Sequence, residues 1–242
     1  SEGYRKNSQS SFNAENISLF YDHSSSLQLK FEYTHSNYLI RLAGPLNDSM
    51  FAADPRSSTR SRNYYNPDIH IPSLTVNWKI LPSTQLFFSL SKIIGSRNSV
   101  MFDKPATVRD SIVTSTLQYN NRQVDIDHFN SLTSELRLIH SFKAGRQVHE
   151  LCTGIQLMDN DLHRQQLGKG TTGSDFDLSL VQPGWGRDLH YKTLNIAVFA
   201  EQRVHLTSRL LLSGGLRFES GESKMSGKII YYSDSLLPNN IQ

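Results

Sequence analysis

Arginine is the residue type whose placement in this sequence best supports a ligand-binding role. A guanidinium group is permanently charged, and its fork of N–H donors matches the paired oxygens of a carboxylate or phosphate. Arg60 and Arg62 are two positions apart, so an extended backbone would direct both to one side. The candidate binding residues, all expected in long loops, are Arg56, Arg60, Arg62, Arg97, Arg122 and Arg164. Two alternatives stay open: a basic, solvated set of loops, or contacts to lipopolysaccharide phosphates.

Histidine and aspartate give weaker signals, for a metal site. No two of the 9 histidines are closer than nine positions in the chain, so neither His-x-His nor His-x-x-x-His occurs, and surface or loop positions are expected. Asp-x-Asp pairs would direct two carboxylates the same way on an extended chain, as a calcium clamp requires. Solvated loop acids are the favoured interpretation of these pairs, which are Asp125/Asp127, Asp159/Asp161 and Asp175/Asp177.

The segment Gly168–Gly173 satisfies G-x-G-x-x-G, a pattern that binds dinucleotides only between a strand and a helix. The residues after it, 174–180, alternate like a strand, so a loop turn is expected. No G-x-S-x-G and no arguable set of nucleophile, base and orienting residue occurs, so the chain is expected not to be an enzyme. No resident cofactor or metal is expected. The single cysteine, Cys152, excludes an internal disulfide and a multi-cysteine metal cluster.

The amino-acid composition excludes further classes of protein. The 242 residues are 37% hydrophobic and 19% charged, and no stretch approaches the roughly 18–20 apolar residues of a spanning helix. The net charge is +3, and the lysines and arginines are spread along the chain without a patch in which aromatic residues gather among them. This argues against nucleic-acid binding. No signal peptide opens the chain, and its polar start and its stop after Pro238 suggest a piece cut from something longer.

Hydrophobic side chains alternate with polar ones in several segments. From Leu27 to Thr34 every second residue is apolar, which predicts a strand with one apolar and one polar face. Val76 is expected on the apolar face of its strand and Thr75 on the polar face. Similar alternation occurs at 17–21, 74–80, 86–90, 135–139, 151–157, 194–201 and 209–219, which gives eight strands and no helix.

The expected connections alternate between short and long. Short turns are expected at 22–26, 81–84, 143–146 and 203–208, and loops of more than 30 residues at 42–72, 94–130 and 159–190. Transmembrane β-barrels alternate in this way, with short periplasmic turns and long extracellular loops. An antiparallel transmembrane β-barrel portion is therefore the predicted fold. The alternative is a soluble antiparallel barrel or sandwich with one solvated face.

Three segments at consistent spacing carry a family resemblance. They are Leu194–Gln202, Leu206–Leu210 and Gly214–Glu219. They resemble the "Asn-x-Ala-x-Phe-x-(Glu/Gln)", "Leu-Thr-x-Arg-Leu" and "Gly-x-Arg-(Phe/Tyr)-Glu" segments of TonB-dependent outer-membrane receptors. Loop segments 60–74 and 162–170 look like the ferric-citrate branch of that family.

The resemblance implies that residues 1–242 are part of a barrel of 22 strands, without the plug domain and the ends of the barrel. It implies a receptor in the outer membrane of a Gram-negative bacterium that imports a ferric chelate, a siderophore or a ferric citrate-like complex. The expected partners are that chelate, the TonB complex through the plug, and outer-membrane lipid or lipopolysaccharide. Iron would enter only as part of the cargo. An outer-membrane barrel enzyme (protease or phospholipase) and a passive porin are the alternatives.

Overall fold

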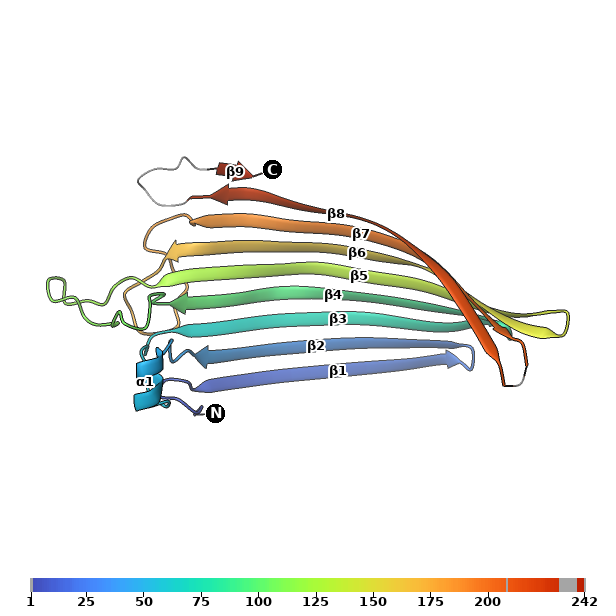
Figure 1. Ribbon diagram of the computed structural model, residues 1–242, viewed down its shortest axis with the longest axis horizontal. Helices are drawn as coiled ribbons and strands as arrows, with labels where there is room; N and C mark the ends of the chain where they lie inside the picture. The colour runs from blue at the N-terminus through green and yellow to red at the C-terminus, as the bar shows by residue number, and fades with distance from the viewer. Residues whose placement is uncertain (1, 208, 231–238, 242) are drawn as a thin grey trace.

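The computed structural model describes residues 2–207, 209–230 and 239–241. They form one antiparallel sheet in which each strand pairs with its neighbours in the sequence, from β1 to β9 (Figure 1). The strands are β1 (Ser10–Ser24), β2 (Leu27–Arg41), β3 (Tyr64–Leu81), β4 (Thr84–Met101), β5 (Gln123–Ala144), β6 (Gln147–Lys169), β7 (Arg187–His205), β8 (Leu211–Ile229) and β9 (Asn239–Ile241). The predicted all-β antiparallel fold and its eight strands are confirmed.

Two elements were not predicted. A six-residue helix, α1 (Asp48–Ala53), lies in the first long loop, where the side chain of Asn47 accepts a hydrogen bond from the backbone N–H of Met50 and so caps the helix. The expectation of no helix was therefore wrong. The short strand β9 is the second addition. Among the described residues, no helix is long and apolar enough to cross a membrane.

The strands are longer than the alternation indicated, and the loops are shorter. The three long connections are residues 42–63, 102–122 and 170–186, and none reaches the expected 30 residues. Hydrophobic alternation does not mark the missed strand ends, because 94–101 carries polar residues on both faces and 64–72 carries Asn66, Asp68 and His70 on the face that is apolar farther along β3. Backbone pairing continues through them regardless of side-chain type. The turn expected at 203–208 includes Ser208, which lies outside the described residues.

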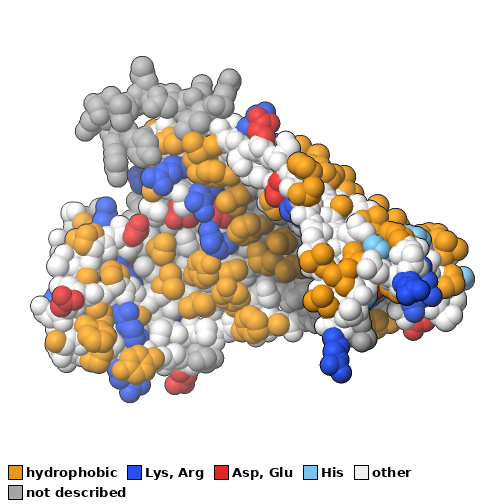
Figure 2. All heavy atoms as spheres, turned by 45° about the vertical axis from the view of Figure 1, so that its right-hand side comes forward, with side chains coloured by type: hydrophobic (Ala, Val, Ile, Leu, Met, Phe, Trp, Pro, Cys, Tyr) orange, Lys and Arg blue, Asp and Glu red, His pale blue; other side chains and the backbone are white. Residues whose placement is uncertain are grey.

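Strand register places apolar residues of all eight long strands opposite one another. One such row runs Tyr21, Leu29, Val76, Phe88, Leu136, Ile155, Val198 and Phe218. Directly paired residues point to the same side of a sheet, so this row defines what we call the apolar face. Figure 2 shows hydrophobic side chains over much of the visible surface, and those of Trp78, Ile155 and Val198 are exposed.

The neighbouring positions define the polar face. Its matching row runs Phe20, Lys30, Thr75, Ser89, Glu135, Gln156, Ala197 and Glu219. Thr75 and Val76 therefore lie on opposite faces, as the alternation predicted.

The main buried cluster lies at the end of the sheet that carries the three long loops, which we call the loop end. Tyr64, Val100 and Val124, from three neighbouring strands, are buried there. Loop 170–186 packs Phe176 and Trp185, with Leu178 and Leu180, against them. Loop 170–186 is thus anchored to the strands by apolar contacts.

Candidate functional site

The six candidate arginines separate into three places. Arg60, Arg62 and Arg122 are buried among the loops, Arg97 and Arg164 lie on strands, and Arg56 is exposed near the N-terminal segment. The Arg56 Nε donates to the Tyr4 carbonyl oxygen at 3.2 Å, and its guanidinium lies 5.4 Å from the centre of the Tyr4 ring. Arg56 therefore does not join either of the other groups.

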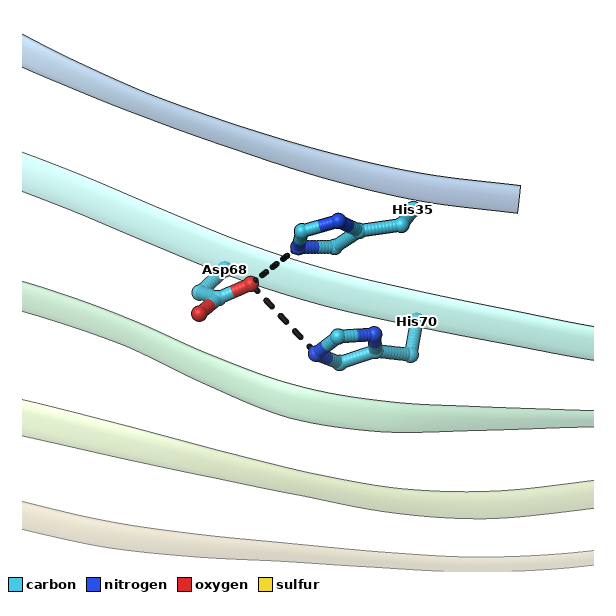
Figure 3. Close-up of side chains that lie close together, drawn as sticks. All are labelled: His35, Asp68 and His70. Atoms are coloured by element: carbon cyan, nitrogen blue, oxygen red, sulfur yellow. Dashed lines mark hydrogen bonds and ion pairs between the residues drawn. The ribbon is translucent and has the colours of Figure 1, made fainter. Parts of the chain in front are cut away.

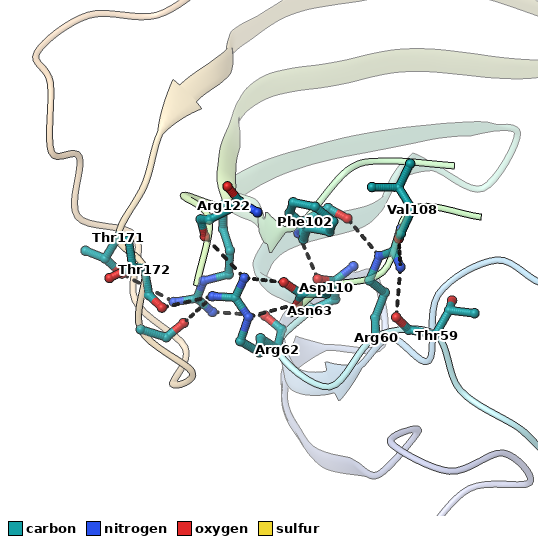
Figure 4. A network of polar contacts seen from close by, with 12 residues as sticks. Thr59, Arg60, Arg62, Asn63, Phe102, Val108, Asp110, Arg122, Thr171 and Thr172 are labelled. Atoms are coloured by element: carbon teal, nitrogen blue, oxygen red, sulfur yellow. Dashed lines mark hydrogen bonds and ion pairs between the residues drawn. The ribbon is translucent and has the colours of Figure 1, made fainter. Parts of the chain in front are cut away.

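Arg60 is 2% exposed and is surrounded by backbone carbonyl groups. Its guanidinium donates to the carbonyl oxygens of Phe102 at 3.0 Å, Thr59 at 2.8 Å and Val108 at 3.1 Å (Figure 4). It also donates to the carbonyl oxygens of Lys104 and Pro105. Burial lowers the pKa of Arg60. Its donors hold loop 102–122 against loop 42–63, and a soluble anion would have to break these bonds to reach them.

Gly44 makes room for this arrangement. It has a φ of +78°, and a Cβ there would lie 2.4 Å from the Arg60 Cγ. Glycine alone tolerates both the backbone conformation and the close approach at this position.

Arg62 joins all three long loops. It forms a two-pronged ion pair with Asp110, with Nε to Oδ2 at 2.8 Å and Nη2 to Oδ1 at 2.6 Å. Its Nη1 donates to the carbonyl oxygens of Thr172 at 2.9 Å and Gly173 at 3.0 Å (Figure 4). Both partners of the ion pair are almost fully buried. The ion pair joins loops 42–63 and 102–122, and the hydrogen bonds of the Arg62 Nη1 add loop 170–186.

Arg122 extends the same network. Its Nη1 donates to the carbonyl oxygens of Arg62 at 2.9 Å and Asp175 at 2.8 Å. Burial, and next the charge of Arg62, lower the pKa of Arg122. The geometry of Arg60, Arg62 and Arg122 is that of side chains that hold loops together.

Arg97 and Arg164 form a separate group with Asp127. The three residues are directly paired on the neighbouring strands β4, β5 and β6. Arg97 Nη2 pairs with Asp127 Oδ2, and Arg164 Nε donates to Asp127 Oδ1 at 2.8 Å. We call this group the Arg–Asp–Arg row. It lies toward the loop end on the polar face, because Arg97 is an even number of residues from Ser89 along β4.

The Arg–Asp–Arg row carries a net positive charge and remains accessible. The side chain of Asp127 is 7% exposed, whereas those of Arg97 and Arg164 are 40% and 30% exposed. The guanidinium of Arg97 lies 5.9 Å from the centre of the Phe129 ring, and that of Arg164 lies 5.9 Å from the Tyr191 ring. Two half-exposed cations around one buried carboxylate, next to aromatic rings, make a surface suited to an anion.

The expected loop positions of Arg97 and Arg164 were wrong, because both belong to strands. The same holds for two of the Asp-x-Asp pairs, since Asp125/Asp127 and Asp159/Asp161 lie on β5 and β6. Asp175 and Asp177 do lie in a loop, where the backbone N–H of Ser179 lowers the pKa of Asp177. Of the glycine-rich segment, Gly168 and Lys169 end β6 and the rest lies in the loop that was expected. Residues 174–186, which follow the segment, contain no helix and belong to no named strand.

The spacing of histidines in the sequence did not reveal that two of them form a cluster with an aspartate. His35 and His70 are far apart in the chain, but β2 and β3 place them directly opposite each other, next to Asp68. Only the pairing of β2 with β3 reveals this cluster, and the eight-residue alternation that identifies β2 ends at Thr34, just before His35.

Comparisons with known proteins place the fold. No protein-family model and no curated protein sequence matches the chain. The crystal structure of the unliganded ferric citrate transporter FecA superimposes with a TM-score of 0.75 over 92% of this chain and 31% of that one, at 15% identity. The siderophore receptor PiuA from Acinetobacter baumannii gives 0.65 over 98% of this chain and 39% of that one, at 14% identity.

The closed form of the ferric-catecholate import receptor Fiu from E. coli K12 gives a TM-score of 0.59 over 98% of this chain and 39% of Fiu, at 12% identity. The chain thus spans between about a third and two fifths of the length of these structures. The sheet therefore has the fold that the resemblance to TonB-dependent receptors implied, and its coverage of these structures is consistent with one part of a larger barrel. The matched proteins are by name a transporter and receptors, in line with the expectation that this chain is not an enzyme.

Proposed function

We propose that this chain forms part of the barrel of an outer-membrane receptor that imports a ferric chelate into a Gram-negative bacterium. The fold shared with a ferric citrate transporter and two siderophore receptors supports this class of function. The observation that carries the proposal is the Arg–Asp–Arg row, whose excess positive charge lies on the polar face near the loops. In a closed barrel the polar face lines the lumen, through which cargo passes.

The row suits an anionic cargo on energetic grounds. Hydrogen bonds to charged groups contribute about 1.5–3 kcal/mol, and solvent screening places half-exposed side chains at the lower end of that range. Arg97 and Arg164 are therefore our first candidates for ligand contact, with Arg56 as an outlying one. We assign Arg60, Arg62 and Arg122 to the support of the loops, because their donors already bind carbonyl oxygens and Asp110.

Energy for import would come from the TonB complex through a plug domain, as the family resemblance implies. Lipid and lipopolysaccharide would contact the apolar face, whose exposed leucine, isoleucine and valine side chains match a hydrocarbon surface. The iron would belong to the cargo.

Binding of ferric chelates to the full-length receptor tests the proposal. Arg97→Gln and Arg164→Gln would be compared singly with the wild type, using ferric citrate, a ferric catecholate and a ferric hydroxamate as probes. We expect at least one probe to bind about tenfold more weakly to each variant, the equivalent of about 1.4 kcal/mol. The loss should be larger at low salt than at physiological salt, because salt screens charge attraction.

Lys192→Gln is the matched control. This substitution also removes one positive charge, but Lys192 lies on the apolar face of β7 and is well exposed. Unchanged affinity of both arginine variants for every probe at both salt concentrations would contradict the proposed site. Absence of binding by the wild-type receptor to all three probes would contradict the proposed class of cargo.

A further inference from the structure

Two histidines and an aspartate converge on neighbouring strands. His35 of β2 lies directly opposite His70 of β3, and Asp68 precedes His70 by two positions on the same face. The Nε2 of His35 is 2.8 Å from Asp68 Oδ1, and the Nε2 of His70 is 3.5 Å from the same oxygen (Figure 3). One ligand atom from each of the three side chains fits within 4.8 Å of the others.

The second nitrogen of each imidazole ring also has a polar neighbour. The Nδ1 of His70 is 2.7 Å from the Tyr33 hydroxyl oxygen, and the Nδ1 of His35 is 3.7 Å from Glu15 Oε2. Histidines that bind metals commonly donate this second N–H to a nearby oxygen, which fixes the ring and leaves the other nitrogen free for the ion. Tyr33 is within hydrogen-bond distance for this role, Glu15 lies slightly farther from its histidine at an ion-pair distance, and both Nε2 atoms face the Asp68 carboxylate.

The three side chains can close around an ion with small movements. The two imidazole rings are stacked 4.3 Å apart with an angle of 2° between their planes. Their Nε2 atoms both point toward Asp68 (Figure 3). Ligand atoms around zinc lie about 2.0–2.2 Å from the ion. Rotation of these partly exposed side chains would bring the nitrogens and the carboxylate oxygen to that distance. The proton in the hydrogen bond between His35 Nε2 and Asp68 would move to Nδ1 or to solvent, and His70 would bind the ion through an unprotonated Nε2.

A second stacked pair in the same sheet lacks this convergence. His163 of β6 and His190 of β7 also lie opposite each other, with ring centres 4.0 Å apart. However, His163 Nε2 pairs with Asp188 at 2.6 Å, whereas His190 Nδ1 pairs with Asp161 at 3.0 Å. Each ring of this pair has its own carboxylate. The shared carboxylate of Asp68 distinguishes the first pair.

We propose that His35, Asp68 and His70 bind a divalent transition-metal ion, for which Zn²⁺ is the best match. Two imidazole nitrogens and one carboxylate oxygen are a ligand set that zinc accepts, with water at the remaining position. The site lies on the apolar face, because Asp68 and His70 are an even number of residues from Val76 along β3. It is therefore on the opposite side of the sheet from the Arg–Asp–Arg row and separate from the path of an imported chelate.

The test is metal titration of the full-length protein after treatment with a chelator. Zn²⁺ binding would be measured by calorimetry and Co²⁺ binding by its visible absorption spectrum, which reports ligand type and geometry. We expect one site in the wild type whose affinity falls at least tenfold in His35→Ala, His70→Ala and Asp68→Asn. Its Co²⁺ spectrum should be lost or altered in the same variants. Tyr33→Phe should weaken binding by a smaller factor, because it removes only a supporting contact.

His163→Ala is the matched control, and it should bind Zn²⁺ as the wild type does. Heat-modifiable electrophoretic mobility of each variant would show that the barrel has folded. The proposal is overturned if the wild type binds no Zn²⁺ at micromolar concentration, or if the His35, His70 and Asp68 variants retain full affinity. An equal loss in His163→Ala would also overturn it, because the site would then not be specific to this cluster.

Discussion

At the scale of single residues, the buried ion pair of Arg62 with Asp110 is one of the contacts that hold the loops together. Removal of one partner of a buried pair leaves an uncompensated charge, which costs about 3–5 kcal/mol. We expect Arg62→Met to loosen the loops by an energy in that range. Limited proteolysis of the folded receptor should then cleave within 102–122 or 170–186 much faster than in the wild type.

The double variant Arg62→Met with Asp110→Asn serves as the control for this prediction. It removes both charges, so no buried charge is left without a partner, and protease resistance should recover in part. Equal cleavage rates in the wild type and Arg62→Met would show that the ion pair does not hold the loops.

The sequence singles out Arg60 and Arg62 as a basic pair, but it does not show which groups surround them. Arg60 and Arg62 belong to the basic loop set that spacing singled out, yet both are buried and bonded to groups more than 40 positions away. Such contacts depend on how three loops fold together, which no local pattern encodes. The His35–His70 pair was missed for a related reason, since strand register sets it.

Gly154 shows how one residue shapes its strand. It lies on the polar face of β6, where a Cβ would sit 2.5 Å from the Phe199 Cζ and 2.7 Å from the Leu136 carbonyl oxygen. The guanidinium of Arg137 lies 5.8 Å from the centre of the same Phe199 ring. We expect Gly154→Ala to displace Phe199 and to cost about 1–3 kcal/mol, the usual range for overpacking.

Guanidinium-induced unfolding of the receptor in detergent measures this cost. Gly214→Ala on β8 is the matched control, because a Cβ there would meet nothing within 4 Å. A shift in the unfolding midpoint that is equal for both variants would assign the effect to the loss of glycine itself and not to Phe199.

At the scale of elements, the two faces of β3 predict opposite responses to the same substitution. Val76 belongs to the apolar row and Thr75 to the polar row. If the apolar face contacts lipid, Val76→Arg should cost about 2–4 kcal/mol near the middle of the membrane, and Thr75→Arg much less. The amount of folded receptor in outer membranes and its unfolding midpoint would measure the difference. Equal tolerance of the two variants would mean that the faces are assigned wrongly.

Alternation located the elements better than it located their ends. It identified β2 from Leu27 because this strand has one apolar and one polar face there. It failed beyond Thr34, where the apolar side of the strand carries His35 in place of a hydrocarbon side chain. The apolar pattern reports the part of a strand that faces hydrocarbon, whereas hydrogen bonding with neighbours sets the full length of the strand.

At the scale of the whole molecule, the described residues form an open sheet. β1 pairs with β2 alone, and the consecutive order from β1 to β9 does not close on itself (Figure 1). An unpaired strand edge exposes backbone donors and acceptors that lipid cannot satisfy, and the exposed apolar face is a second surface prone to aggregation.

We therefore expect residues 1–242, expressed alone, to aggregate in plain buffer or to require detergent, as analytical ultracentrifugation and thermal unfolding would show. In the full-length receptor, by contrast, the neighbouring strands of a closed barrel would satisfy the edge of β1. A soluble, monodisperse monomer of residues 1–242 that melts cooperatively without detergent would contradict the membrane barrel and favour a soluble antiparallel fold.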